Sequence, residues 1–97
     1  MAAGGDAFNI APTSVNAGNY LDIKTTGSNE AVIHNIYFGG KVEISSYDGT
    51  NECIWDQEDG QGAVINMSSH VTNLVYLRVK NVDSGAIFIA ADGMYTK

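Results

Sequence analysis

The amino-acid sequence predicts an all-β domain, either an antiparallel β-sandwich or a jelly-roll-like barrel, with about six to eight short strands. Three observations support this class. Charged residues make up only 16% of the 97 residues, and β-branched and aromatic residues supply most of the bulky apolar content. Short segments that alternate apolar and polar residues follow one another, separated by turn residues. No segment has the 3.6-residue apolar period that indicates a helix.

The first 14 residues differ from the rest of the chain. They are small and aperiodic, with an isolated Phe8 and Ile10 and the chain's single proline, Pro12. We therefore expect a flexible N-terminal arm over residues 1–14, followed by a single β-sandwich domain over residues 15–97. The alternative is an arm that becomes ordered by placing Phe8 and Ile10 on a neighbouring subunit.

The first part of the predicted domain contains three strand-like segments. Residues 19–24 and 41–47 alternate regularly, whereas residues 30–38 carry bulky side chains on both faces. We expect one face of residues 30–38 to pack in the core and the other to meet another chain. The pair Gly39-Gly40 between two alternating segments predicts a hairpin.

The second part begins with the pair Asp48-Gly49, which predicts a tight turn. It leads into a strand over residues 52–56, whose Cys53 and Trp55 we expect to pack in the core. The remaining predicted strands are alternating segments that end at polar or glycine-containing turns: residues 63–68, 74–82 and 86–93.

The charge and the cysteine content limit the partners of the chain. The net charge is -6, with 11 acidic and five basic residues, so no basic face is available for nucleic acid. A single cysteine cannot form an internal disulfide, which favours synthesis in the cytosol. We find neither a secretory signal pattern nor an apolar run long enough for a transmembrane helix. We therefore expect neither nucleic acid nor a membrane as a partner.

The residues that could carry chemistry lack the patterns that chemistry requires. Cys53 stands between Glu52 and apolar residues, which is not the electropositive setting of an activated thiol. The spacing of His34, His70 and Cys53 lacks the paired close ligands of a zinc site. We expect no enzymatic activity and no cofactor.

The densest group of carboxylates follows the only tryptophan. Counted from Asp56, the positions of glycine and glutamate do not match a calcium-binding EF-hand loop. Asp56, Glu58 and Asp59 remain candidates for an irregular cation site. The alternative is a solvated end of a hairpin.

Aromatic side chains offer a further candidate site, because sugars stack on aromatic rings. The alternative is that tyrosines of a small β-domain occupy half-buried strand positions or interfaces. The candidate glycan contacts are four tyrosines on predicted strands: Tyr20, Tyr37, Tyr47 and Tyr76.

Several strand and turn segments resemble a group of short β-rich virion proteins of tailed bacteriophages. They are "NAGNYLDIK", "AVIHNIYF", "YDGTNE" and "HVTNLVYLRVKN", together with the final "AADGMYTK". The likeness covers about residues 16–97 and rests on strand and turn patterns. It implies a structural role, as a capsid decoration or cement protein, a head fibre, or a tail or neck component.

The resemblance implies a protein of the virion, made in the host bacterial cytoplasm, that stabilises the capsid shell through subunit contacts. Its partners would be copies of itself, with a trimer favoured, and the major capsid protein or other virion proteins. We expect Phe8, Ile10 and Pro12 to contact the shell or the adjacent subunit. The alternative is a tail, neck or head-fibre component whose tyrosines bind a host-surface glycan.

Overall fold

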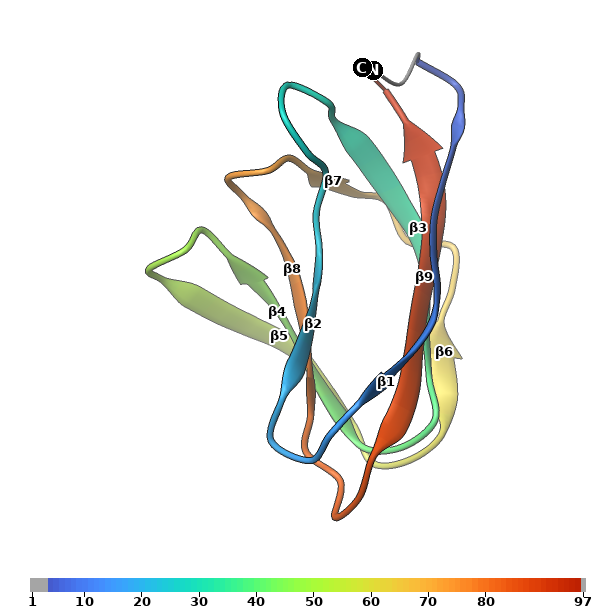
Figure 1. Ribbon diagram of the computed structural model, residues 1–97, viewed down its shortest axis with the longest axis vertical. Helices are drawn as coiled ribbons and strands as arrows, with labels where there is room; N and C mark the ends of the chain where they lie inside the picture. The colour runs from blue at the N-terminus through green and yellow to red at the C-terminus, as the bar shows by residue number, and fades with distance from the viewer. Residues whose placement is uncertain (1–3, 97) are drawn as a thin grey trace.

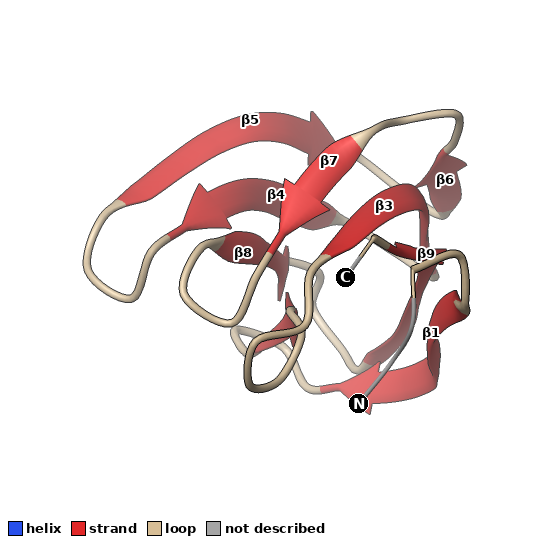
Figure 2. Ribbon diagram, turned by 90° about the horizontal axis from the view of Figure 1, so that it is seen from above, coloured by secondary structure: helices blue, strands red, loops and turns tan. Residues whose placement is uncertain are grey.

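The computed structural model describes residues 4–96 and confirms the all-β prediction. Two antiparallel sheets pack face to face as a sandwich (Figures 1 and 2), and no segment of residues 4–96 is helical. Accordingly, this range contains no helix able to cross a membrane. In chain order the strands are β1 (Ala7–Val15), β2 (Tyr20–Ile23), β3 (Ala31–Phe38), β4 (Val42–Tyr47), β5 (Glu52–Glu58), β6 (Gly62–Val64), β7 (Ser69–Val71), β8 (Tyr76–Asn81) and β9 (Ile87–Tyr95).

The two sheets are built mostly from strands that are far apart in the sequence. The larger sheet has five strands in the order β1-β9-β3-β6, and β7 also pairs with β3. The smaller sheet has four strands in the order β2-β8-β4-β5. Among the described strands, only β4 and β5 are chain neighbours that pair with each other. Figure 2 shows the two sheets facing each other, with β5, β4 and β8 on one side and β3, β9 and β1 on the other.

The core lies between the sheets and is formed by the inward positions of both. Alternation predicted these positions correctly in the regular strands, including Val42 and Ile44 in β4, and Leu77 and Val79 in β8. The largest fully buried apolar side chains come from six strands: Ile23, Ile33, Ile36, Ile44, Leu77, Ile89, Val42, Val71 and Val79.

A β-bulge corrects the alternation expected for β3. Strict alternation would place Ile33 and Ile36 on opposite faces of the strand. The register against β9 shifts between Ile33 and Asn35, and both isoleucines are fully buried. One extra residue at the bulge changes the phase of the alternation, so that both side chains point into the core.

The Gly39-Gly40 link does not form the predicted hairpin, because it carries the chain from one sheet to the other. Both edges of β3 are already occupied, by β9 on one side and by β6 and β7 on the other. Gly40 is buried, and a Cβ atom there would collide with Asp83 and Ile87. The glycine pair therefore allows a tight connection between the two sheets, and β4 pairs with β5 and β8 instead of with β3.

The N-terminal segment is also corrected. Residues 7–14, predicted as part of a flexible arm, belong to β1, which pairs with β9 along the edge of the larger sheet. The register shifts between Ile10 and Thr13, around Pro12, whose missing N–H is tolerated at an edge strand and at a bulge. The strand was hidden because this bulge interrupts its alternation. Residues 1–3, also assigned to the arm, lie outside the described residues.

The turn predicted at Asp48-Gly49 is confirmed. Asp48 Oδ1 accepts hydrogen bonds from the backbone N–H groups of Thr50 (2.9 Å) and Asn51 (2.7 Å), and Gly49 has a φ of 93°. These backbone bonds hold the pKa of Asp48 below its usual range. A left-handed φ suits glycine because it has no Cβ. The turn joins β4 to β5.

Cys53 and Trp55 do not pack in the core as predicted. Cys53 is exposed, and 43% of Trp55 is exposed. β5 is the outermost strand of the smaller sheet, and Figure 1 shows the β4–β5 hairpin projecting from the body of the sandwich. The register against β4 jumps from Asp56 to Ile54, so Trp55 is the extra residue of a bulge.

Candidate functional site

Charged residues are distributed very unevenly between the two sheets. Within the five strands of the larger sheet, Asp92 is the single residue of the Asp, Glu, Lys and Arg types. The four strands of the smaller sheet contain seven such residues: Asp22, Glu43, Glu52, Asp56, Glu58, Arg78 and Lys80. The outer surface of the larger sheet is therefore the charge-poor side of an acidic protein.

Alternation along β9 creates an apolar surface on this side. Ile87 and Ile89 point into the core, while Phe88 points outward and is 62% exposed. The pairing of Tyr37 with Ala90 brings the Tyr37 ring, 41% exposed, to the same surface. Together with Pro12 of β1, these side chains border one shallow cavity. We call Pro12, Tyr37, Phe88 and Ala90 the apolar face.

The cavity at the apolar face has a volume of about 350 Å³. Its lining is uncharged throughout: Pro12, Tyr37, Phe38, Gly39, Gln61, Gly62, Phe88, Ile89 and Ala90. Aromatic rings with little charge around them are typical of the centre of a protein interface. A shallow cavity of this kind can hold an apolar side chain or a small ring of a ligand.

The one carboxylate of the larger sheet is held by its neighbours. Asp92 Oδ1 accepts a hydrogen bond from Asn35 Nδ2 (2.7 Å), and Asp92 Oδ2 accepts one from the Tyr37 hydroxyl (2.8 Å). The hydrogen bond to Asp92 raises the pKa of Tyr37. The Tyr37 hydroxyl is thereby fixed as a donor, and its ring is oriented along the apolar face.

The outer surface of the smaller sheet uses its aromatic rings differently. The Arg78 guanidinium lies 3.6 Å from the centre of the Tyr20 ring and 3.9 Å from the centre of the Tyr47 ring. Two of its nitrogens also donate to the carboxylate of Asp22, at 2.8 and 3.2 Å. These hydrogen bonds raise the pKa of Arg78, so its charge is permanent. The stack is a cation–π arrangement closed by a bidentate ion pair.

Three of the four tyrosines predicted as glycan contacts, Tyr20, Tyr47 and Tyr76, are brought together on the smaller sheet, but their rings pack against Arg78 or against one another. Tyr20 and Tyr47 lie against Arg78, and Tyr76 is only 8% exposed. Tyr76 also contacts Tyr47 edge to face, with ring centres 5.8 Å apart. Tyr37 lies on the other sheet, at the apolar face. Of the four, Tyr37 is the one beside the uncharged cavity.

The three residues predicted to contact the shell are also separated. Phe8 is 5% exposed and packs edge to face on Tyr95, with ring centres 5.3 Å apart. Ile10 is partly buried against the core. Pro12 is exposed and lines the cavity of the apolar face. Pro12 is thus the member of this group whose side chain is available to a partner.

The acidic residues considered for a cation lie at the end of β5. The carboxyl group of Glu58 is hydrogen-bonded to Asp56, which raises the pKa of Glu58. Within residues 4–96, no three side chains of the His, Cys, Asp and Glu types converge as a metal-binding group. Asp56, Glu58 and Asp59 therefore do not form a ligand set in this conformation.

Cys53 has no activating partner nearby. It borders a cavity of about 260 Å³, lined by Ser46, Tyr47, Asp48, Asn51, Glu52, Cys53 and Val75. The lining contains two carboxylic acids and no histidine, lysine or arginine. A nucleophilic thiol requires a base or an electropositive setting, which these residues do not supply.

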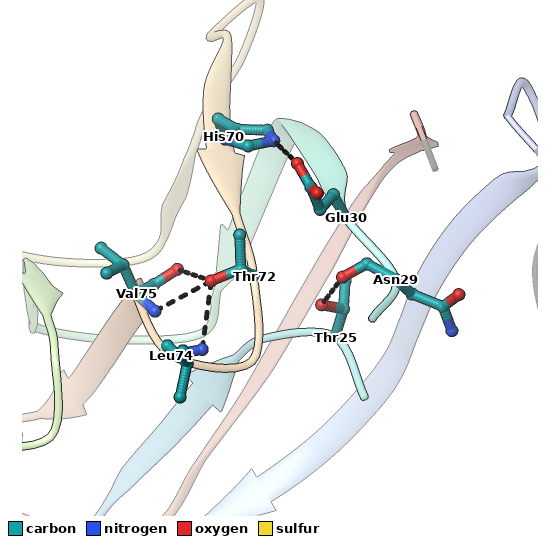
Figure 3. Close-up of polar contacts among 7 residues, drawn as sticks. All are labelled: Thr25, Asn29, Glu30, His70, Thr72, Leu74 and Val75. Carbon is teal, nitrogen blue, oxygen red and sulfur yellow. Dashed lines mark hydrogen bonds and ion pairs between the residues drawn. The ribbon is translucent and has the colours of Figure 1, made fainter. Parts of the chain in front are cut away.

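His70 of strand β7 contacts Glu30, which immediately precedes strand β3. Its Nε2 lies 3.0 Å from Glu30 Oε1, beside the connection between β7 and β8 (Figure 3). In that connection Thr72 Oγ1 accepts hydrogen bonds from the backbone N–H groups of Leu74 (3.1 Å) and Val75 (3.0 Å). The two hydrogen bonds to Thr72 lie within the connection, where Leu74 is 70% exposed.

Comparisons with models of protein families and with curated proteins find no match to this chain.

Sequence reasoning did not single out Phe88, the most exposed ring of the apolar face. Its signal is nevertheless present in the sequence. Residues 86–91 form an apolar run without a charge, whereas residues 76–80 of β8 alternate with Arg78 and Lys80.

Proposed function

We propose that this chain is a non-catalytic structural protein of a tailed-phage virion, made in the host bacterial cytoplasm. In this role it is a capsid decoration or cement protein that stabilises the shell through its apolar face. The observation that supports the proposal is the charge-poor outer surface of the larger sheet, with Phe88 62% exposed in a chain of net charge -6. Two acidic proteins can meet there without placing carboxylates opposite one another.

The size of the sandwich supports contacts of moderate area. The chain measures 38 × 26 × 20 Å, and Figures 1 and 2 show the two sheets facing each other across the middle dimension. The outer surface of one sheet is then close to the roughly 800 Å² that each partner of a stable complex buries. One subunit contact that covers this surface would bury about the area that is typical of a stable complex. A trimer at the three-fold positions of a shell multiplies that contact.

The test compares two exposed apolar residues. Shells assembled without the protein are mixed with the wild-type chain, with Phe88→Ser or with Leu74→Ser, and are then sedimented. Leu74 is 70% exposed but lies outside the apolar face, so its variant is the matched control. We expect Phe88→Ser to bind at least about tenfold more weakly, since central aromatic residues dominate interfaces. We expect Leu74→Ser to bind like the wild type.

Two results would reject parts of the proposal. Equal binding of Phe88→Ser and Leu74→Ser would reject the apolar face as the contact. A wild-type chain that binds neither shells nor complete particles would reject the virion role itself. The oligomeric state in solution, measured by analytical ultracentrifugation, decides whether a trimer forms before binding.

A second candidate function is a tail, neck or head-fibre component that binds a host-surface glycan. One feature favours it: Tyr37 and Phe88 border the same cavity as Gln61, which combines aromatic rings with an amide. A glycan array probed with the wild type and with Phe88→Ser tests this candidate. A signal lost in Phe88→Ser supports it, and an array without any binder rejects it.

A further inference from the structure

β5 presents an open edge of the smaller sheet. Six of its seven residues pair with β4 on one side, Trp55 being the bulge residue, and none of the described strands pairs with its other side. At the turn, the N–H of Asp48 donates to the carbonyl of Asn51. In an antiparallel pair, residues that exchange backbone hydrogen bonds alternate along the strand with residues that do not. The N–H and C=O groups of Glu52 and Ile54 consequently point away from β4. They are available to an additional strand.

Side chains and cavities along this edge suit a second strand. Ile54 is 47% exposed, and Trp55, displaced by the bulge, is 43% exposed. One cavity of about 260 Å³ reaches Cys53, and another of about 400 Å³ is lined by Ile54, Trp55, Asp56 and Gln57. When a peptide adds to a sheet edge, backbone hydrogen bonds give affinity, and cavities for side chains give specificity.

The charge of the edge selects the kind of strand. Glu52, Asp56 and Glu58 lie on β5, and Asp59 follows it. None of the four forms an ion pair with any residue of the described range 4–96. A second copy of β5 would bring further carboxylates to the same edge and be repelled. A basic segment would instead bring opposite charges to these carboxylates.

We propose that the edge of β5 docks an extended, basic segment of a partner protein, which adds to the smaller sheet as a further strand. The backbone groups of Glu52 and Ile54 hold the segment by main-chain hydrogen bonds. Its Lys or Arg side chains contact the carboxylates, and one of them lies over the exposed ring of Trp55. This docking edge is separate from the apolar face and does not depend on the function proposed above.

The only tryptophan of the chain lies on this edge, so its fluorescence reports binding directly. The probe is a nine-residue peptide of alternating Lys and Val, and the control peptide has Glu in place of each Lys. We expect a saturable change in Trp55 emission with the Lys peptide, and binding that weakens as salt is added. Amide hydrogen exchange at Glu52 and Ile54 should slow on binding. The Glu peptide should have neither effect.

Two pairs of variants separate the backbone and charge contributions, with binding measured by calorimetry. Ile54→Pro removes an outward N–H, whereas Ile54→Thr keeps it. We expect Ile54→Pro to bind the Lys peptide at least about tenfold more weakly than Ile54→Thr does. The double variant Asp56→Asn, Glu58→Gln should weaken binding about three- to tenfold, as expected for two exposed ion pairs. Asp92→Asn, which removes a charge on the other sheet, should bind like the wild type.

Several results would overturn the proposal. The Lys peptide could fail to bind saturably, or the Glu peptide could bind equally well. Trp55 emission could also change with protein concentration in the absence of peptide, which would indicate that two β5 edges pair with each other. If Ile54→Pro does not fold, unchanged affinity of the double charge variant would still reject the proposal. Phe88→Ser should bind the peptide normally, so failure of the shell contact is distinguished from failure of the edge.

Discussion

The outer surfaces of the two sheets both carry aromatic rings, but the rings have different neighbours. On the smaller sheet, Tyr20 and Tyr47 enclose the Arg78 guanidinium. On the larger sheet, Phe88 is exposed, and the described strands around it supply no lysine or arginine. Where the sheet provides a cation, an outward aromatic ring thus makes a cation–π contact within the chain. Where it does not, the ring remains available to a partner.

This difference predicts where substitutions affect stability and where they affect binding. Substitutions in the Arg78 stack should lower the free energy of unfolding, because the stack joins three strands of the smaller sheet. Substitutions of exposed side chains on the apolar face should leave it unchanged. In the larger sheet, we instead expect the free energy of unfolding to fall where a substitution adds a side chain between two closely spaced strand backbones.

The largest effect is expected for Gly93→Ala in the larger sheet. A methyl group at Gly93 would overlap the backbone carbonyl of Val32 in the neighbouring strand β3. We expect a loss of about 3 kcal/mol in the free energy of unfolding, measured by chemical denaturation. Gly60→Ala is the matched control, because a Cβ there meets nothing within 4 Å. An equally small effect at both glycines would contradict the close approach of β9 and β3.

A smaller effect is expected for Arg78→Lys. Lysine keeps the charge but loses the planar group that stacks on two rings and donates twice to Asp22. We expect destabilisation of about 1–2 kcal/mol by chemical denaturation. The opposite exchange in the same strand, Lys80→Arg, should have little effect, because Lys80 is exposed. If the free energy of unfolding is unchanged in Arg78→Lys, the stack does not stabilise the fold, and the two outer surfaces do not differ in the way described above.

Phe88→Ser should change the free energy of unfolding by less than about 0.5 kcal/mol, because most of the ring is already in water. Its neighbour Ile89 is fully buried, and Ile89→Ala should cost about 3 kcal/mol. Thermal and chemical denaturation of both variants provides the measurement. If Phe88→Ser is as unstable as Arg78→Lys, the Phe88 ring contributes to the fold, and the apolar face loses its main support.

The smallest effect concerns pH at the end of β5. The hydrogen bond to Asp56 raises the pKa of Glu58 above its ordinary value of 4.5. A raised carboxyl pKa means that the folded state binds this proton more tightly than the unfolded state does. Ionisation of Glu58 therefore destabilises the folded state, and the destabilisation appears as the pH rises through the folded pKa. Glu58→Gln should therefore slightly raise the melting temperature near neutral pH, and should not raise it below pH 4.5. A gain that is equal at both pH values would show that charge is not its cause.

Asp83 has the opposite dependence and serves as the comparison. The backbone N–H of Lys41 donates to its carboxylate (3.0 Å) and holds the pKa of Asp83 below the ordinary 3.8. Its contribution is present above pH 3.8 and is lost as the pH falls through the folded pKa. Asp83→Asn should therefore lower the melting temperature near neutral pH, and this difference should disappear in acid.

The sequence predicted the features that depend on neighbouring residues. Asp48 and Gly49 define their turn by local hydrogen bonds and a left-handed φ. Alternation correctly identifies Val42 and Ile44 in β4 and Leu77 and Val79 in β8 as inward, but it fails at the start of β8, where Tyr76 is buried and Val75 is exposed. The Gly39-Gly40 link was misinterpreted because a hairpin and a crossing between sheets have the same local signal. Which of them forms depends on β9 and β6, which lie far along the chain and occupy the edges of β3.

The surface features were harder to predict, because they depend on pairing across the sheets. Cys53 and Trp55 were assigned to the core by their apolar character, yet β5 is an edge strand with a bulge. The stack on Arg78 requires the register of β2, β8 and β4, in which Asp22 and Ser45 flank Arg78. The sequence does contain one usable signal that was overlooked: the strands of the larger sheet share a near absence of charge.

The position of β9 has a consequence for how the molecule folds. β9 is the last described strand, but it lies inside the larger sheet, between β1 and β3. During synthesis these two strands must remain without their shared partner until residues 87–95 have left the ribosome. Only the β4–β5 hairpin can form early from neighbouring residues. We therefore expect slow refolding, on the order of milliseconds to seconds, with the hairpin protected from hydrogen exchange before either sheet is complete.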